Sequence, residues 1–253
     1  MIDKETLVSI AKLHNLKPWQ QEKHYIQTLI LVAISESPLV FKGGTYLWFF
    51  HGLNRFSEDL DFTASETIPK DIEKKVSQTL ETFGVENKIK IMTDDERGFS
   101  FRISSKGPIN TTDVDVCHVY IEISKRENII SQPLSFKLNF EEYKLPTKII
   151  RGMNLDEVVA EKIRAIMNRK KARDVYDLFF LIDNKKVEFN LDKINEKAKY
   201  YNTTFSESEF IAKINEKKEG WNKELEPWVF GELMDFDLAV NTIIKWIKTN
   251  KKK

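Results

Sequence analysis

The sequence predicts a mixed α/β domain over residues 1–150, followed by a helical domain over residues 151–253. In the first part, short stretches of alternating apolar and polar residues, typical of strands, are interspersed with helix-spaced apolar positions. From Asn154 onward the apolar spacing is helical to the end of the chain. We therefore expect an α+β mixed sheet packed against helices, completed by a C-terminal domain built from helices alone.

Two predicted helices precede the first strand. Residues 3–13 and 18–34 carry apolar side chains at helical spacing, and Pro18 suits the first turn of the second helix. We expect both helices to support the first strand of the sheet.

A glycine turn follows that strand. Residues 38–41 form a short apolar run, and Lys42 precedes Gly43 and Gly44 before a helix begins at Thr45. Two glycines permit a tight turn and a close approach of the backbone to a ligand. The first N–H groups of the helix would then point at a phosphate, so the pattern predicts a phosphate-binding turn.

Two acids on one strand come next. Asp59 and Asp61 alternate with Leu60 and Phe62, so the period of a strand places both carboxylates on one face and both apolar side chains on the other. Carboxylates about 6–7 Å apart along a strand can hold two Mg²⁺ ions, which stabilise the attacking and leaving oxygens in phosphoryl chemistry. Mg²⁺ prefers hard oxygen ligands, and Mn²⁺ accepts the same ones.

The rest of the α/β domain reads as one helix and three antiparallel strands. The helix covers residues 69–83, Gly107 and Pro108 mark a turn, and the strands cover 88–92, 98–104 and 114–124. Glu122 faces away from its apolar neighbours, so an adjacent strand can bring it beside the two aspartates as a general base or a third metal ligand. An ordinary outward-facing acid explains Glu122 nearly as well, and Asp113 and Asp115 rank below it.

The helical domain opens with a pattern close to a capping box, in which Asn154 caps a helix and Glu157 follows three residues later. Lys162 lies on this helix within a basic stretch. Residue type alone favours a solvated basic face, and the other interpretation is a clamp for a triphosphate. Asp174 and Asp177 share one flank of the following helix, either as helix-terminal charges or in internal ion pairs.

Arg55 and Ser57 lie in the loop that leads to the acidic strand. An arginine there pairs with the aspartates or reaches a phosphate. Ser57 either lines a nucleotide site or closes a turn through a hydrogen bond.

Composition restricts the class of protein. Apolar residues make up 41% of the chain, enough for a packed core, and 40 basic residues balance 39 acidic ones, so any nucleic-acid binding needs local patches. The single cysteine excludes an internal disulfide, and without a signal-peptide pattern or a membrane-length apolar run we expect a cytoplasmic protein that binds no membrane. Neither a P-loop nor a dinucleotide-binding glycine pattern is present.

The glycine turn and the two acids resemble the signature of the polymerase-β-like nucleotidyltransferase superfamily. The longer string Arg-Phe-Ser-Glu-Asp-Leu-Asp-Phe at residues 55–62 resembles the AbiEii/AbiGii branch, which contains toxins of abortive-infection and toxin–antitoxin systems. Two later stretches fit the same branch, around Glu122 and over residues 157–178. The resemblance covers roughly residues 38–180.

This resemblance implies a nucleotidyltransferase core completed by the helical domain. It further implies an enzyme that transfers NMP from an NTP to an acceptor hydroxyl on RNA such as tRNA, acts as a toxin and is controlled by an antitoxin encoded nearby, which either binds or modifies it. The implied metal ligands are Asp59, Asp61 and Glu122, and the implied catalytic residues also include Lys162, Asp174 and Asp177. The implied nucleotide-binding residues are Lys42, Gly43, Gly44, Thr45, Arg55, Ser57 and Lys162.

Two other functions share these residues. One is a non-catalytic nucleotide-binding regulator, which we rank second because every expected acidic position is occupied. The other is a nucleotidyltransferase for small molecules, whose acceptor pocket the sequence does not reveal.

Overall fold

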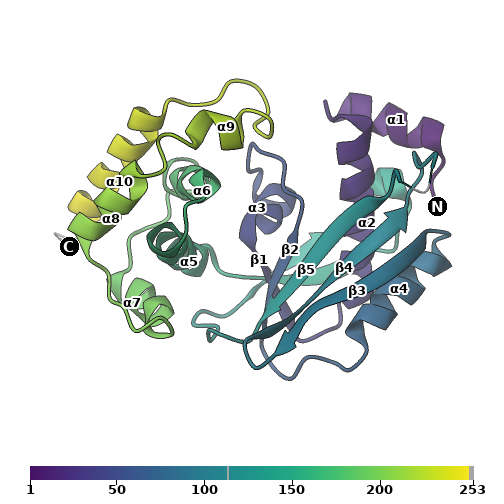
Figure 1. The fold of residues 1–253 in the computed structure, drawn as a ribbon, viewed down its shortest axis with the longest axis horizontal. Helices are drawn as coiled ribbons and strands as arrows, with labels where there is room; N and C mark the ends of the chain where they lie inside the picture. The colour runs from purple at the N-terminus through teal and green to yellow at the C-terminus, as the bar shows by residue number, and fades with distance from the viewer. Residues whose placement is uncertain (113, 251–253) are drawn as a thin grey trace. The chain divides into compact units, whose positions relative to one another are not determined.

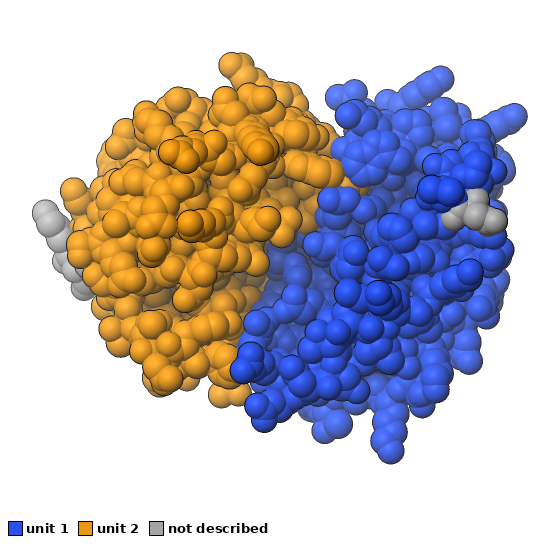
Figure 2. Space-filling view, in the orientation of Figure 1, with its two compact units in different colours: residues 1–46, 58–126, 133–152 blue, residues 47–57, 127–132, 153–253 orange. Residues whose placement is uncertain are grey.

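A computed structural model of the protein describes residues 1–112 and 114–250, so Asp113 lies outside the described residues. The chain forms two compact units, shown in different colours in Figure 2. Unit 1 comprises Met1–Tyr46, Glu58–Arg126 and Pro133–Gly152, and unit 2 comprises Leu47–Ser57, Glu127–Gln132 and Met153–Lys253. Two short segments from the first part of the chain thus belong to unit 2. The predicted domain boundary after residue 150 stays a prediction.

Unit 1 contains a mixed sheet of seven strands in the order β3-β4-β5-β2-β1-β7-β6. Figure 1 labels β1 to β5 of this sheet. β2 runs parallel to β5, β1 runs parallel to β7, and the other neighbours are antiparallel. The strands are β1 (Leu39–Lys42), β2 (Leu60–Ala64), β3 (Glu86–Asp95), β4 (Gly98–Lys106), β5 (Cys117–Ser124), β6 (Leu134–Leu138) and β7 (Lys148–Gly152). The predicted antiparallel set β3, β4 and β5 is confirmed, whereas β6 and β7 were not expected from the sequence.

The helices of unit 1 follow the apolar spacing closely. The two predicted N-terminal helices are confirmed as α1 (Lys4–Leu13) and α2 (Pro18–Ile34), with Pro18 in the first turn of α2. α4 (Ile72–Thr82) lies beside α2, and both lie behind the sheet in Figure 1. A short 3-10 helix, η1 (Glu141–Tyr143), precedes β7.

The core of unit 1 lies between these helices and one face of the sheet. Leu60 and Phe62 of β2 are at most 2% exposed, and the Phe62 ring stacks on Phe41 of β1 with the ring centroids 5.0 Å apart. Ile121 and Ile123 of β5 lie opposite Leu60 and Phe62 in the parallel register and are equally buried. The residues between them, including Asp61 and Glu122, consequently lie on the other face of the sheet.

Unit 2 is helical, as predicted. Its helices are α5 (Leu155–Asn168), α6 (Ala172–Asp183), α7 (Leu191–Lys199), α8 (Glu207–Asn215), α9 (Trp221–Leu225) and α10 (Phe236–Asn250). The C-terminal five residues of α3 (Gly43–His51) also belong to this unit.

The predicted capping box at the start of α5 is wrong. Asn154 occupies the N-cap position, but its side chain makes no capping hydrogen bond. The buried Glu157 carboxylate instead accepts hydrogen bonds from the backbone N–H groups of Ile130 and Ser131 and pairs with Lys197 at 2.6 Å. The amides of the 127–132 segment need a buried acceptor, and Glu157 supplies it.

Within residues 1–112 and 114–250, none of the helices has both the length and the apolar character that crossing a membrane requires.

Candidate functional site

A row of charged residues crosses three neighbouring strands of unit 1. The register places Lys42 of β1 opposite Asp61 of β2, and Asp61 opposite Glu122 of β5. Opposed residues on neighbouring strands point to the same face, so one ammonium and two carboxylates share the face that α2 and α4 leave uncovered. The sheet thus places Glu122 in register with the aspartate motif, which the sequence alone left open.

The glycine turn packs directly against this row. Gly43 has φ +77°, and a Cβ atom built there would lie 2.2 Å from Asp61 Oδ2. Only glycine accommodates both the left-handed backbone and this close approach. α3 begins at Gly43 itself, two residues earlier than predicted, so the strand passes into the helix without an intervening loop.

Thr45 joins the glycine turn to the acidic motif. Its buried hydroxyl donates a 2.5 Å hydrogen bond to the backbone carbonyl of Asp59. Asp59 itself lies one residue before β2, which begins at Leu60, so it is not inside the strand as predicted. The hydroxyl of Thr45 therefore fixes the backbone of Asp59 beside the first turn of α3.

The three acidic side chains differ in exposure and pairing. Asp59 and Asp61 are half-buried, whereas the Glu122 side chain is 56% exposed and pairs with Arg126 at 2.6 Å. Among the residues that the structure describes, no three acidic, histidine or cysteine side chains converge to hold a metal on their own. Mg²⁺ commonly takes one or two carboxylates and completes its shell with substrate phosphates and water, so the two aspartates fit such an ion together with a triphosphate.

Unit 2 contains a buried ion-pair cluster of its own. Arg55 donates two hydrogen bonds of 2.7 Å to the two carboxylate oxygens of Asp177. Lys162 donates to Asp177 at 2.6 Å and to Asp174 at 3.2 Å, and its side chain is only 8% exposed. The interpretation of Lys162 as part of a solvated basic face is therefore wrong, because its ammonium is enclosed between two carboxylates.

Asp174 and Asp177 stay ionised because cations surround them. Burial by itself would raise the pKa of Asp177, but Arg55 and Lys162 hold that pKa below its usual value. Burial by itself would also raise the pKa of Asp174, but Lys162 and Arg169 hold that pKa below its usual value. Both carboxylates are fully buried and both contact Lys162, so internal ion pairs describe them better than helix-terminal charges.

The loop that carries Arg55 is fastened to the C-terminal region. Arg55 forms an antiparallel bridge with Val229, and the backbone N–H of Phe56 donates to the carbonyl of Trp228 at 2.8 Å. The rings of Phe56 and Trp228 stack with an interplanar angle of 12°. Ser57 follows this anchored segment and is half-buried. No sequence pattern indicated the contribution of residues 228–229.

The predicted site residues gather in two groups, each within its own unit. Unit 1 brings together Lys42, Gly43, Gly44, Thr45, Asp59, Asp61 and Glu122, and unit 2 brings together Arg55, Lys162, Asp174 and Asp177, with Ser57 two residues beyond Arg55. Arg169, in the basic stretch that follows Lys162, was not singled out from the sequence, and its guanidinium donates to Asp174 at 2.6 and 2.8 Å.

In a comparison with known protein families, one family model matches most of the chain. Residues 28–242 match the family model described as nucleotidyl transferase AbiEii toxin, type IV toxin–antitoxin system. No curated protein matches significantly.

Several solved structures share the fold. A Helicobacter pylori protein described as a nucleotidyltransferase superposes with a TM-score of 0.67 at 21% identity, covering 94% of this chain and 96% of the other. JHP933, also from Helicobacter pylori, gives a TM-score of 0.65 at 22% identity, covering 92% of each chain. MenT4, a nucleotidyltransferase toxin from Mycobacterium tuberculosis, gives a TM-score of 0.56 at 16% identity, covering 98% of this chain and 90% of the other. At these sequence identities, the similarity to the three structures shows a shared fold only.

Proposed function

The chain belongs to the nucleotidyl transferase AbiEii toxin family of type IV toxin–antitoxin systems, and on that basis we propose that it transfers a nucleoside monophosphate from an NTP to a hydroxyl of RNA, such as tRNA. The observation that carries this proposal is the row of Lys42, Asp61 and Glu122 beside the glycine turn. Two carboxylates and a phosphate-sized turn on one sheet face are a combination that suits nucleotidyl transfer.

The residues of unit 1 act on the reacting groups. Asp59 and Asp61 would hold two Mg²⁺ ions, which supply charge neutralisation at the phosphates when bound. Gly43, Gly44 and the N-terminus of α3 bind phosphate oxygens through backbone N–H groups. Glu122 orients the acceptor hydroxyl and takes its proton, while the hydroxyl oxygen bonds to the α-phosphorus and pyrophosphate leaves with the bridging oxygen.

The residues of unit 2 hold the nucleotide. An ammonium has three N–H donors, and Lys162 directs two of them at Asp174 and Asp177. We propose that the third reaches the triphosphate, with the two carboxylates fixing the direction of the ammonium. Arg55 fixes Asp177 in turn, so it supports nucleotide binding through Lys162, and Ser57 lines the same site.

An RNA acceptor agrees with the local charge of unit 2. Lys170 and Lys171 are exposed in the turn between α5 and α6, next to the Lys162 cluster. Exposed lysines supply the sequence-independent attraction to a phosphate backbone that the nearly neutral chain lacks as a whole. Because the family consists of toxins from toxin–antitoxin systems, we also propose a cognate antitoxin encoded nearby.

The test is incubation of the purified protein with each NTP labelled at the α-phosphate, Mg²⁺ and total RNA. We expect labelled RNA from the parent, and loss of label by a factor of about 10³ or more in a folded Asp59→Ala, Asp61→Ala variant or after EDTA treatment. Glu81→Ala, on the exposed side of α4, is the matched control and should label normally.

Each negative outcome rejects a different part of the proposal. Near-normal labelling by the double aspartate variant would reject the assignment of the metal-holding acids. Label in small molecules alone would reject the RNA acceptor, and absence of transfer from every NTP would favour a nucleotide-binding regulator.

A further inference from the structure

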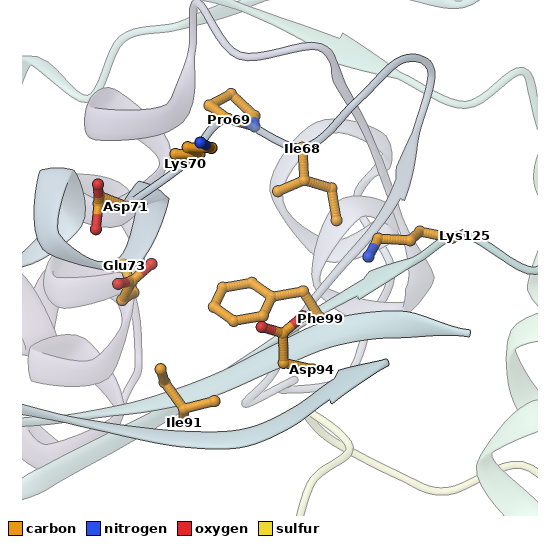
Figure 3. A pocket seen from close by; sticks show the side chains of 9 residues that line it. All are labelled: Ile68, Pro69, Lys70, Asp71, Glu73, Ile91, Asp94, Phe99 and Lys125. Carbon is orange, nitrogen blue, oxygen red and sulfur yellow. The ribbon is translucent and has the colours of Figure 1, made fainter. Parts of the chain in front are cut away.

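A pocket of about 360 Å³ lies beside the first turn of α4 in unit 1 (Figure 3). Its walls come from the loop before α4, from α4, from β3 and β4, and from the residue after β5. Phe99, Ile91 and Ile68 give it apolar surfaces, and two carboxylates, Glu73 and Asp94, line it from different elements. A pocket of this size is large enough for a small organic ligand.

The pocket is separate from the row of proposed active-site acids. Phe99 of β4 lies opposite Ile123 of β5 in the antiparallel register, so the two side chains share a face. Ile123 belongs to the face covered by α2 and α4, whereas Glu122 points to the other face. A ligand in this pocket would therefore bind on the opposite side of the sheet from Asp61 and Glu122.

Glu73 is the unusual residue of the pocket. It is only 8% exposed, yet within residues 1–112 and 114–250 its carboxylate makes no hydrogen bond or ion pair. Buried carboxylates are normally paired, because removing an unpaired charge from water is costly. The positive end of the α4 dipole offsets part of that cost, since Glu73 lies in the first turn, but it supplies no counter-charge.

Asp94 adds a second carboxylate to the same space. It lies opposite Phe99 in the β3–β4 register, at the edge of a row that continues through Ile123 and Phe62. Asp94 is exposed, and a charged residue on an edge strand discourages pairing with another sheet, which is a sufficient reason for Asp94 alone. In Figure 3, however, Glu73 reaches the pocket from α4 and Asp94 from β3, with the Phe99 ring between them in this view.

Two lysines also line the pocket, Lys70 in the exposed loop before α4 and Lys125 after β5, and among the described residues neither pairs with Glu73 or Asp94. Asp71 pairs with Lys74 on the exposed surface at 2.5 Å, and Lys125 donates to the backbone carbonyl of Asp95 at 3.2 Å. Across the described part of the chain, no three potential metal ligands lie together, and apolar walls supply none. An organic cation suits this lining better than a metal ion.

We propose that the pocket binds a small organic cation, an amine, guanidinium or amidinium group carried on a short apolar or aromatic body. The cationic head pairs with Glu73 and Asp94, and the body packs on Phe99, Ile91 and Ile68. A charge-assisted hydrogen bond to each carboxylate and the face of the Phe99 ring favour a cation over a neutral ligand of equal shape.

The experiment uses the full chain with benzamidine and, as its neutral isostere, benzamide. Titration calorimetry should show saturable binding of benzamidine and binding of benzamide at least about tenfold weaker, the ratio expected from losing one charge-assisted contact. Glu73→Gln should weaken benzamidine binding by a similar factor. The matched control Glu81→Gln, exposed on the same helix, should bind as the parent does.

Three outcomes would overturn the proposal. These are no saturable binding of benzamidine, equal binding of benzamide, and unchanged benzamidine affinity in Glu73→Gln. Thermal unfolding establishes that each variant is folded, and if Glu73→Gln does not fold, Asp94→Asn decides the question with the same expected loss. Nucleotidyl transfer plays no part in the readout, so the result is independent of the proposed function.

Discussion

Replacing Arg55 by methionine should destabilise the protein through Asp177. The Arg55 side chain is 4% exposed and the Asp177 side chain is fully buried, with two N–H donors 2.7 Å from the two carboxylate oxygens. Methionine keeps much of the apolar stem but removes the guanidinium. Asp177 then remains buried with Lys162 as its remaining cationic partner.

The expected loss follows from that geometry. Breaking a buried ion pair costs about 3–5 kcal/mol when the remaining charge has no other partner. Lys162 still contacts Asp177 at 2.6 Å, so we expect the lower end, about 3 kcal/mol, or a fall in Tm of roughly 6–12 °C for a chain of this size. The control Lys218→Met breaks the exposed pair with Asp237 in the same unit and should cost less than about 1 kcal/mol.

The pH dependence of the loss provides a second measure. The lowered pKa of Asp177 contributes stability that is present above its unfolded pKa of about 3.9 and is lost as the pH falls through the folded value. Removing Arg55 raises the folded pKa, so the variant should differ most from the parent at neutral pH and least near about pH 2–3.

Urea unfolding at pH 7 and at pH 3, followed by circular dichroism, measures both effects. A loss below about 1 kcal/mol at pH 7, equal to that of Lys218→Met, would refute the reasoning, because Asp177 would then not depend on Arg55. So would a loss that is the same at both pH values.

Three further predictions concern other parts of the molecule. Gly43→Ala should abolish transfer by displacing Asp61, because the new Cβ would lie 2.2 Å from Asp61 Oδ2. The control Gly52→Ala, with a similar φ of +75° and nothing within 4 Å, should lose only about 1–2 kcal/mol of stability and keep its activity. Equal activities of the two variants would contradict this prediction. Lys162→Met should lower the NTP affinity measured by calorimetry roughly tenfold or more. Lys170→Met, at an exposed position, is the control. An unchanged NTP affinity in Lys162→Met would remove Lys162 from the nucleotide site. Burial lowers the pKa of His24 to about 3, so the unfolded chain binds a proton between about pH 6.5 and that value that the folded chain does not bind, and the parent should lose stability as the pH falls through this range. His24→Gln should flatten this part of the plot of unfolding free energy against pH. An unchanged slope would contradict the lowered pKa of His24.

Local patterns determined the elements and the residue types of the site. Apolar spacing located α1 and α2 almost to the residue, and period-two alternation located β4, because side-chain direction repeats with the local backbone geometry. The glycine turn and the acid pair were recognisable because each lies within a few consecutive residues. By contrast β6 and β7 were not predicted, although Leu134, Phe136 and Leu138 of β6 alternate with polar residues, because a pattern of five residues is too short to separate a strand from a loop without its neighbours.

Partnerships between distant residues were decided only by the tertiary structure. The sequence placed Glu122 on a strand, but the parallel pairing of β2 with β5 put it in register with Asp61. Residue type alone favoured a solvated Lys162, and the packing of α5 against α6 buried that side chain between two carboxylates. Local periodicity fixes which way a side chain points along its own element. The charge that this side chain meets depends on which other element packs against it, and that packing is determined by burial summed over the whole chain.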